Sequence, residues 1–285
     1  ALLLAGMNLF DSVIYAMGTA GTGGFANRGL SVAYYDSRVI EVILGVAMLL
    51  FGINFNLYYY AIFRSVKDSL KSEELWTYLA IIGVSSILVF VSILPLYNSV
   101  GYAGANSFFT VSSIITTTGY VSADFGQWPL FARNILIILM FIGGCAGSTA
   151  GGLKVSRIIM ILRSAVNQVK QSINPMRVTV NRLDGKRVDD DVERATNRYL
   201  LMYILLFIIF LIIITFDTND FETAFTAVAT TINNIGPNIG QFGPMETFAG
   251  MSYLSKFVLT LAMLFGRLEI YPMLLLFSPF TYKNI

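Results

Sequence analysis

Long apolar runs alternate with short polar segments along this chain, and most of the runs are long enough to cross a membrane. A transmembrane helix needs about 20 mainly apolar residues. Four runs reach that length and are read as complete spans: Val39–Phe63, Tyr78–Leu96, Arg198–Phe216 and Phe248–Phe280. A fifth run begins at Pro129 and is interrupted by glycines. The pattern predicts an all-α polytopic membrane protein.

Three shorter amphipathic stretches lie between the long runs, and each is followed by a glycine-containing loop. The loops are Gly21–Phe25, Thr116–Tyr120 and Thr231–Pro237. Aligned on Gly24, Gly119 and Gly236, they define a repeating unit of helix, re-entrant helix, loop and helix. Helix-start signals are Asn8 with Asp11, Asn106 with Ser107, and Asp220 with Glu222, so the re-entrant helices are expected to begin near Asn8, Gly104 and Asp220.

A second alignment supports the repeat without using the loops. The helix after each loop carries apolar residues directly before a glycine, at Leu50–Gly52, Met140–Gly143 and Leu264–Gly266. The alternative is that each glycine only allows close packing of membrane helices.

Carbonyl oxygens in loops of this kind can replace the water around a monovalent cation, and threonine hydroxyls can add further oxygens. Glycine tolerates the positive φ that turns a carbonyl toward an axis. A short helix also points the negative end of its dipole at the loop that follows it, which favours a cation there. The three loops therefore predict a cation pore, and the alternative is a set of buried turns that bind no ion.

Composition and charge limit the remaining possibilities. The chain is 55% hydrophobic and 13% charged, with no histidine and one cysteine. This excludes an internal disulfide framework and removes the commonest proton relay and catalytic base. The basic residues cluster after Phe63 and between Lys154 and Arg198, so the positive-inside rule places these two loops in the cytoplasm. No nucleic-acid partner is expected from a net charge of +2.

The glycine-rich segment, residues 143–152, contains nothing bulkier than Thr149. A continuous helix from Pro129 to Val166 would be about 57 Å long, nearly twice the hydrocarbon thickness. We therefore expect a break beneath the loops. The alternative is close helix packing, because small residues recur four apart in two series. These series are Gly143, Gly147 and Gly151, and Gly144, Ser148 and Gly152.

Arg267 lies in an otherwise nearly uncharged apolar stretch, where an unpaired charge costs several kcal/mol. Glu269 is two positions away and cannot pair with it along one helix face. Each must therefore find a partner outside the helix, and a purely structural ion pair is one alternative for Arg267. Lys154 and Arg157 are expected to share a helical face at the cytoplasmic edge, where their side chains would extend toward water.

The residues Thr116–Tyr120, Gly143–Lys154 and Gly266–Glu269 resemble the Trk/Ktr/HKT superfamily of potassium transporters, and most closely its bacterial Trk membrane subunit. The resemblance covers essentially the whole chain, and the middle phrase is the most specific. It implies four pore units in one chain around a pseudo-fourfold pore. Three loops are present here, so the first unit and most of the outer helix of the second are expected in sequence that this chain lacks.

The resemblance also implies roles for individual residues. The selectivity filter would comprise Thr22, Gly23, Gly24, Thr117, Thr118, Gly119, Asn234, Ile235 and Gly236. A gate below it would comprise Gly143, Gly144, Gly147, Ser148, Gly151, Gly152 and Arg267, with possible support from Lys154, Arg157 and Glu269. On this reading a fixed positive charge at Arg267 repels K⁺ when the pore is narrow.

The expected organisation follows from the repeat. It comprises the second pore unit (1–63), a cytoplasmic loop (64–77), the third unit with a broken inner helix (78–166), a cytoplasmic excursion (167–197) and the fourth unit (198–285). The excursion is either a solvated loop or, by resemblance, the surface that meets a ring of nucleotide-binding regulatory subunits. The family also forms homodimers in the bacterial inner membrane.

The function expected is potassium uptake without catalysis, with K⁺ as the transported ion and no cofactor. A nonselective or Na⁺-preferring channel on the same scaffold is the nearest alternative. An intramembrane hydrolase would need histidine ligands, a serine with a histidine base, or paired aspartates within the spans, none of which this sequence offers. A scaffold subunit with no pore is the third possibility.

Overall fold

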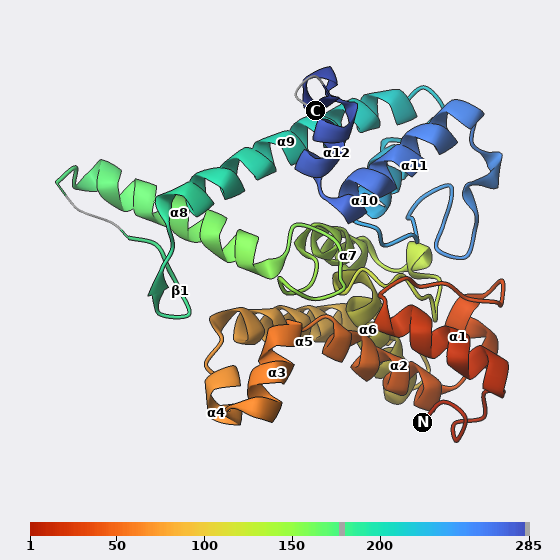
Figure 1. Ribbon diagram of the computed structural model, residues 1–285. Helices are drawn as coiled ribbons and strands as arrows, with labels where there is room; N and C mark the ends of the chain where they lie inside the picture. Colours follow the sequence, from red (N-terminus) through yellow and green to blue (C-terminus); the bar gives the residue numbers. More distant parts are fainter. Residues whose placement is uncertain (177–179, 283–285) are drawn as a thin grey trace.

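The computed structural model describes residues 1–176 and 180–282, and their regular secondary structure is almost entirely helical. Helices α1 to α6 occupy one half of the molecule and α9 to α12 the other, with α7 and several loops between them (Figure 1). Helix α8 and a short hairpin extend away from both halves (Figure 1). The division into pore units stays a prediction. Positions 177–179 of the excursion and 283–285 of the fourth unit lie outside the described residues.

The first half begins with α1 (Leu9–Ala20), a 3₁₀ turn (Ser31–Tyr35), α2 (Arg38–Phe51), α3 (Phe55–Phe63) and α4 (Val66–Ser69). The expected span over Val39–Phe63 is not one continuous helix, because α2 and α3 meet at 85°. The carbonyl of Gly52 accepts the N–H of Cys145 at 2.9 Å, and Asn54 caps α3 by accepting the N–H of Asn56. Contacts that an apolar pattern does not encode therefore stop α2.

The chain continues through α5 (Glu73–Ile93), a 3₁₀ turn (Leu94–Leu96), α6 (Val100–Ile115), a second 3₁₀ turn (Phe125–Gln127), α7 (Leu130–Ile142) and α8 (Val155–Ile173). The predicted interruption after Pro129 is present between α7 and α8. The predicted start of α6 near Gly104 is wrong, because Asn106 and Ser107 lie inside the helix and are buried. Ser107 donates to the carbonyl of Ser86 instead of capping.

A two-stranded hairpin, β1 (Arg182–Leu183) with β2 (Lys186–Arg187), forms around a turn at Asp184 and Gly185. After it come α9 (Asp190–Ile214), α10 (Phe221–Ile232), a 3₁₀ turn (Phe248–Gly250), α11 (Tyr253–Leu268), α12 (Ile270–Phe277) and a last 3₁₀ turn (Pro279–Tyr282). The hairpin is the exception to the helical fold within the described residues.

The expected span over Phe248–Phe280 is also not one continuous helix, because α11 and α12 meet at 119° at Glu269. Among the described residues, Glu73–Leu96 and Asp190–Ile214 are each long and apolar enough to cross a membrane alone. Counted as one span each, the two bent helix pairs bring the number of candidate membrane spans among these residues to four.

Asp217 lies just after the end of α9 and accepts the N–H of Ser252 at 2.6 Å. This hydrogen bond lowers the pKa of the Asp217 carboxyl group.

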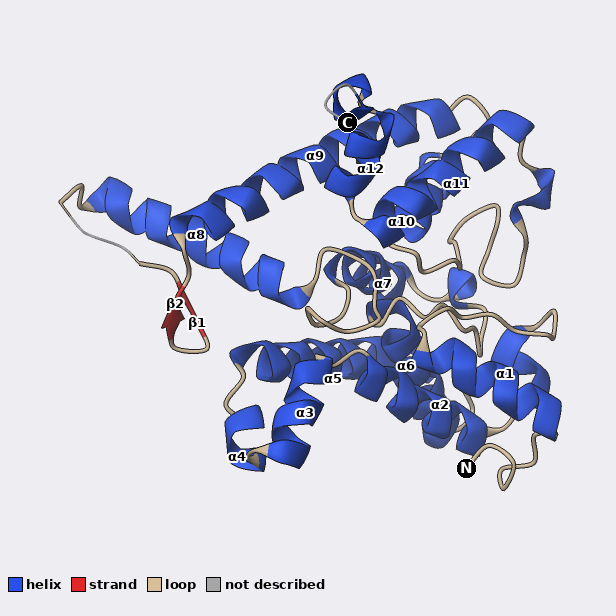
Figure 2. Ribbon diagram, in the orientation of Figure 1, coloured by secondary structure: helices blue, strands red, loops and turns tan. Residues whose placement is uncertain are grey.

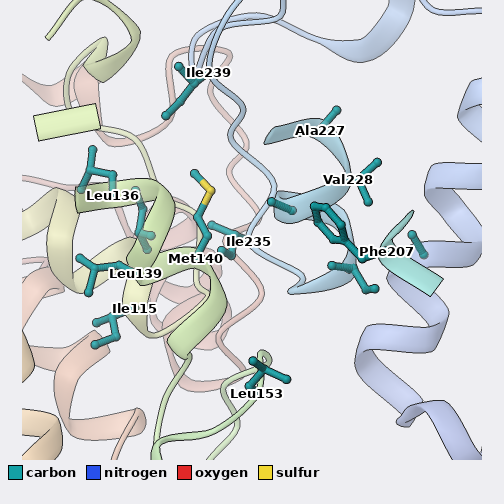
Figure 3. Packing of buried hydrophobic residues seen from close by; sticks show 14 of the residues in the cluster. Ile115, Leu136, Leu139, Met140, Leu153, Phe207, Ala227, Val228, Ile235 and Ile239 are labelled. Atoms are coloured by element: carbon teal, nitrogen blue, oxygen red, sulfur yellow. The ribbon is translucent and has the colours of Figure 1, made fainter. Parts of the chain in front are cut away.

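The hydrophobic core joins the two halves through α7. Leu136, Leu139 and Met140 of α7 are buried beside Ile115 of α6 and Ile235 of the third loop (Figure 3). On its other side, Phe141 packs its ring against Phe207 and Phe225, at centroid distances of 5.6 and 5.9 Å. The loops that the sequence singled out lie between these packed helices, as the tan segments of Figure 2 show.

The helix-start signals at Asn8 and Asp220 are confirmed. Asn8 Oδ1 accepts the N–H of Asp11 at 2.7 Å, and Asp220 Oδ2 accepts the N–H of Thr223 at 3.0 Å. Each bond satisfies a donor that the first helical turn leaves free.

We predict that Asn8→Ala lowers the free energy of unfolding by about 1 kcal/mol, because α1 loses its cap. Thermal unfolding of the detergent-solubilised protein measures this. Asn8→Ser, which keeps an acceptor oxygen, is the control, and equal destabilisation by both substitutions would contradict the role of the cap.

Candidate functional site

The three re-entrant helices α1, α6 and α10 end in the same hydrogen-bonded turn. At the end of α1, the N–H of Gly23 donates to the carbonyl of Gly18 at 2.8 Å and that of Thr22 donates to Thr19 at 3.1 Å. These bonds form a Schellman motif, in which the chain leaves a helix through one left-handed residue. The equivalents are Thr118 to Ser113 (3.0 Å), Thr117 to Ile114 (3.0 Å), Ile235 to Thr230 (2.8 Å) and Asn234 to Thr231 (3.1 Å). The loops therefore leave their helices in the same way.

Two positions in each loop have left-handed backbone. The first is Thr22, Thr117 or Asn234, with φ of 48°, 56° and 57°, and the second is Gly24, Gly119 or Gly236, with φ of 65°, 81° and 103°. Glycine accepts such angles readily, but a β-branched threonine rarely does. Strained residues of this kind gather at functional sites. The sequence indicated positive φ only at the glycines and gave no signal for the two threonines.

The loops contact one another in sequence order. A Cβ atom added to Gly24 would lie 1.8 Å from the carbonyl oxygen of Thr118, and one added to Gly119 would lie 1.7 Å from that of Ile235. Each of these glycines therefore packs against the main chain of the next loop. A Cβ atom on Gly236 would meet no described atom within 4 Å.

A cavity of 560 Å³ lies between the first and the third loop. It is lined by residues of the first loop and α1, including Met17 and Thr22, and by Asn234 of the third loop and Arg267. Several apolar side chains of this face are exposed, among them Met17 (72%) and Phe25 (77%). The first and third loops thus face each other across an open space instead of touching.

Tyr120 supports the first loop from the second, a role that sequence reasoning missed. Its hydroxyl lies 3.2 Å from the carbonyl of Tyr15 in α1 and 3.3 Å from that of Phe25. The Tyr15 and Tyr120 rings also pack at a centroid distance of 5.1 Å. Tyrosine directly after the loop glycine was visible in the sequence, but its partner was not.

The glycine-rich segment connects α7 to α8 beneath the loops without forming a helix. Gly143, Gly147 and Gly152 have φ of 76°, 69° and 74°. The alternative of close packing between continuous helices is therefore wrong for this segment. Its ends close on each other, since a Cβ atom on Gly152 would lie 2.9 Å from Cα of Gly143. Gly144 accepts the N–H of Val155 at 3.0 Å.

Hydrogen bonds join this segment directly to the loops above it. The N–H of Gly151 donates to Thr117 Oγ1 at 2.5 Å, and Thr22 Oγ1 donates to the carbonyl of Thr149 at 2.8 Å. Ser148 bonds within the segment, to the carbonyl of Cys145. The hydroxyls of Thr22 and Thr117 are thus engaged by the glycine-rich segment.

Arg267, near the end of α11, binds both structures at once. Its Nη1 donates to the carbonyl of Thr149 at 3.0 Å, and its Nη2 donates to that of Gly21 at 3.1 Å. Gly21 is the C-cap of α1, so the guanidinium lies where the dipole of that helix is negative. No ion pair of the described residues includes Arg267, and its charge is compensated by main-chain carbonyls.

Two of the three inner-helix glycines, Gly52 and Gly266, are in close contact with neighbouring elements. A Cβ atom on Gly266 would lie 1.9 Å from the carbonyl oxygen of Ile232, the last residue of α10. On Gly52 it would lie 2.3 Å from the hydroxyl of Tyr78. Close approach at Gly266 brings α11, and with it Arg267, against the end of a re-entrant helix.

Glu269 and Arg157 find each other across the chain. Arg157 Nη2 of α8 lies 2.9 Å from Glu269 Oε1 at the bend between α11 and α12, and its guanidinium lies over the ring of Tyr199 in α9. A cavity of 390 Å³ is bordered by these residues, by Arg267 and by much of the glycine-rich segment. The prediction that Glu269 needs a partner outside its own helix is confirmed.

The prediction that Lys154 and Arg157 share a helical face is wrong. Helix α8 begins at Val155, and Lys154 precedes it with a left-handed φ of 73°. The Lys154 ammonium group donates back to the carbonyl of Ala150. The positive charge is therefore turned into the glycine-rich segment instead of extending along α8.

Comparison with known proteins adds independent information. The model of the TrkH family, described as cation transport protein, matches residues 83–282. The Trk system potassium uptake proteins TrkH and TrkG of Escherichia coli K12 are 35% and 33% identical to this chain over 100% and 99% of its length. The crystal structure of the potassium transporter TrkH from Vibrio parahaemolyticus superposes with a TM-score of 0.89 over 98% of this chain at 33% identity.

The chain is shorter than the proteins it resembles. It spans 59% of the E. coli TrkH sequence, 58% of TrkG and 60% of the Vibrio TrkH chain.

We predict that Gly119→Ala destabilises the fold by about 2 kcal/mol or more, because the added methyl group overlaps a main-chain carbonyl and the backbone is left-handed. Thermal unfolding measures the loss. Gly83→Ala in α5 is the matched control, since its Cβ atom would meet nothing within 4 Å. Similar unfolding temperatures for both variants would contradict the packing of the loops.

Proposed function

Because the chain belongs to the TrkH family of cation transport proteins, we propose that it takes part in potassium uptake across the bacterial inner membrane, as one part of a multi-pass pore. Three things support this: the potassium uptake proteins that it resembles over its full length, its apolar spans, and the three equivalent loops.

The filter is built from the main chain of the three loops, Thr22–Gly24, Thr117–Gly119 and Asn234–Gly236. The observation that carries this assignment is the recurrence of one left-handed pattern at the ends of three helices. Carbonyl oxygens replace the hydration shell of K⁺, while the helix C-termini of α1, α6 and α10 supply negative potential. A rigid loop reduces the reorganisation that binding a dehydrated ion requires.

A fourth unit completes the ring, and it is supplied by sequence outside this chain. Gly24 and Gly119 each pack against the following loop, whereas a Cβ atom on Gly236 would meet no described atom within 4 Å. The cavity of 560 Å³ between the first and third loops is the place for the additional loop.

The glycine-rich segment and Arg267 form the gate. The segment lies directly beneath the loops, bonded to Thr22 and Thr117, and Arg267 holds it to the end of α1. A fixed positive charge on the ion path raises the energy of a passing K⁺ unless the pore widens and water screens the charge. Lys154 adds charge at the same level, and the Arg157–Glu269 pair links the gate to α8.

The wider assembly is a homodimer regulated by a cytoplasmic ring of nucleotide-binding subunits. The Trk-system names of the relatives support a multi-subunit complex. Helix α8 and the hairpin, which carry many of the basic residues, are the elements available to such a ring (Figure 1).

A nonselective or Na⁺-preferring channel on the same scaffold is the second candidate. The observation that favours it is the third loop, where Asn234 stands in place of Thr22 and Thr117, and Ile235 in place of Gly23 and Thr118. Four unequal loops discriminate ions less strictly than four identical ones.

We predict moderate selectivity for K⁺ over Na⁺ in the full-length protein. Reversal potentials in mixed K⁺ and Na⁺ solutions measure it, and growth of a strain that lacks K⁺ uptake at low K⁺ provides the cellular test. Equal permeability of the two ions would favour the second candidate.

We predict that Arg267→Gln raises basal K⁺ flux, because the barrier charge is lost and the bonds to Thr149 and Gly21 are weakened. Arg267→Lys is the control: it retains the charge but not the planar pair of donors, so its flux stays nearer to that of the unmodified protein. Rb⁺ uptake into proteoliposomes measures both. Unchanged flux in Arg267→Gln would indicate a structural role only.

A further inference from the structure

Glu74, in the first turn of α5, is a buried carboxylate that none of the roles above uses. Its side chain is only 6% exposed, whereas that of its neighbour Glu73 is 42% exposed. An ionised side chain is rarely buried unless it has strong partners. The question is therefore what holds the carboxylate of Glu74 in the interior.

Both hydrogen bonds of Glu74 Oε1 come from main-chain N–H groups, one within the glycine-rich segment and one in the helix that follows it. The N–H of Ala146 donates to it at 2.7 Å, and the N–H of Ser156 donates at 3.1 Å. Ala146 lies near the start of the segment, and Ser156 lies in the first turn of α8. A single oxygen thus joins the segment to the first turn of α8.

The two N–H groups favour a negatively charged acceptor, whereas burial of the side chain opposes the charge. The first N–H groups of α8 have no partner within the helix and carry its positive dipole end. A carboxylate forms stronger hydrogen bonds to them than a neutral acceptor does. The other main-chain N–H groups that the segment donates to its surroundings, from Cys145 to Gly52 and from Gly151 to Thr117, bind neutral acceptors.

The segment needs such an anchor more than most loops do. Residues 143–152 contain five glycines, so fixing their backbone costs more conformational entropy than fixing other residues. Without Glu74, the N–H groups of Ala146 and Ser156 would be left without their acceptor in a poorly hydrated interior.

We propose that Glu74 is the positioning residue that holds the glycine-rich segment in place beneath the filter. This inference rests on the proposed role of that segment as the gate. Glu74 touches no transported ion and acts through the main chain of Ala146 and Ser156. Glu73 points elsewhere, since it pairs with Arg163 at 3.0 Å and its N–H donates to Asp184 of the hairpin. Two adjacent glutamates on one helix therefore have separate tasks.

The chain contains a reporter for this idea, because its one cysteine, Cys145, is fully buried within the glycine-rich segment. In the full-length protein in proteoliposomes, we would measure two quantities for each variant. One is the rate at which a water-soluble maleimide labels Cys145, followed by mass spectrometry of the peptide that contains it. The other is basal Rb⁺ flux.

We expect Glu74→Ala and Glu74→Asp to increase labelling of Cys145 by about tenfold, since alanine removes the acceptor and aspartate is too short to reach both N–H groups. Basal flux should rise with labelling. Glu74→Gln should change both quantities much less than these two variants, because its amide oxygen reaches both N–H groups but is a weaker, neutral acceptor. Glu73→Gln is the matched control and should change neither quantity.

Unchanged labelling and flux in Glu74→Asp and Glu74→Ala would overturn the inference, and so would equal effects of Glu74→Gln and Glu74→Asp. If Glu74→Ala does not fold, the order of the aspartate and glutamine variants still decides. Faster labelling without a change in flux in the Glu74 variants, together with unchanged flux in Arg267→Gln, would support the role of Glu74 as an anchor of the segment. The same result would reject the role of the segment as a gate. If labelling is unchanged in the Glu74 variants while flux is raised in Arg267→Gln, the role of Glu74 is rejected but the proposed gate is not.

Discussion

The structure depends on one constraint: main-chain N–H and carbonyl groups outside helices must find partners where water is scarce. Four non-helical segments meet at the centre of this molecule, and they satisfy one another. The three loops bond back to the ends of their own helices, and the glycine-rich segment bonds to Thr22, Thr117 and Gly52. Side chains complete the set at two points, Arg267 for carbonyls and Glu74 for N–H groups.

This mutual satisfaction links the parts that the proposed function separates into filter and gate. Thr149 illustrates the link, because its carbonyl accepts from both Thr22 and Arg267. A displacement of the glycine-rich segment would therefore break bonds to a loop and to α11 together. Helix α8 follows that segment directly and leads toward the hairpin. A movement of α8 or of the hairpin would therefore reach the same bonds through the main chain. Packing at Gly266 keeps α11 close enough to take part.

Much of this arrangement was predictable from the sequence. The apolar runs, the caps at Asn8 and Asp220, and the interruption of the fifth run all follow from local chemistry. The bends at Gly52 and Glu269 did not, because an apolar pattern fixes burial but not direction, and the contacts that stop these helices come from distant segments. The left-handed backbone of Thr22 and Thr117 could not be predicted either. Nor could the burial of Glu74, since a glutamate in the first turn of a helix is common. The assignment of filter and gate residues stays a prediction.

The most direct test of the account is the position of a bound ion. A crystal structure of the full-length protein grown with Rb⁺ should show anomalous scattering on the pore axis, within about 3 Å of main-chain oxygens from the loops at Thr22, Thr117 and Asn234. Scattering elsewhere, or none at a concentration that supports flux, would contradict the claim that these loops bind a dehydrated cation.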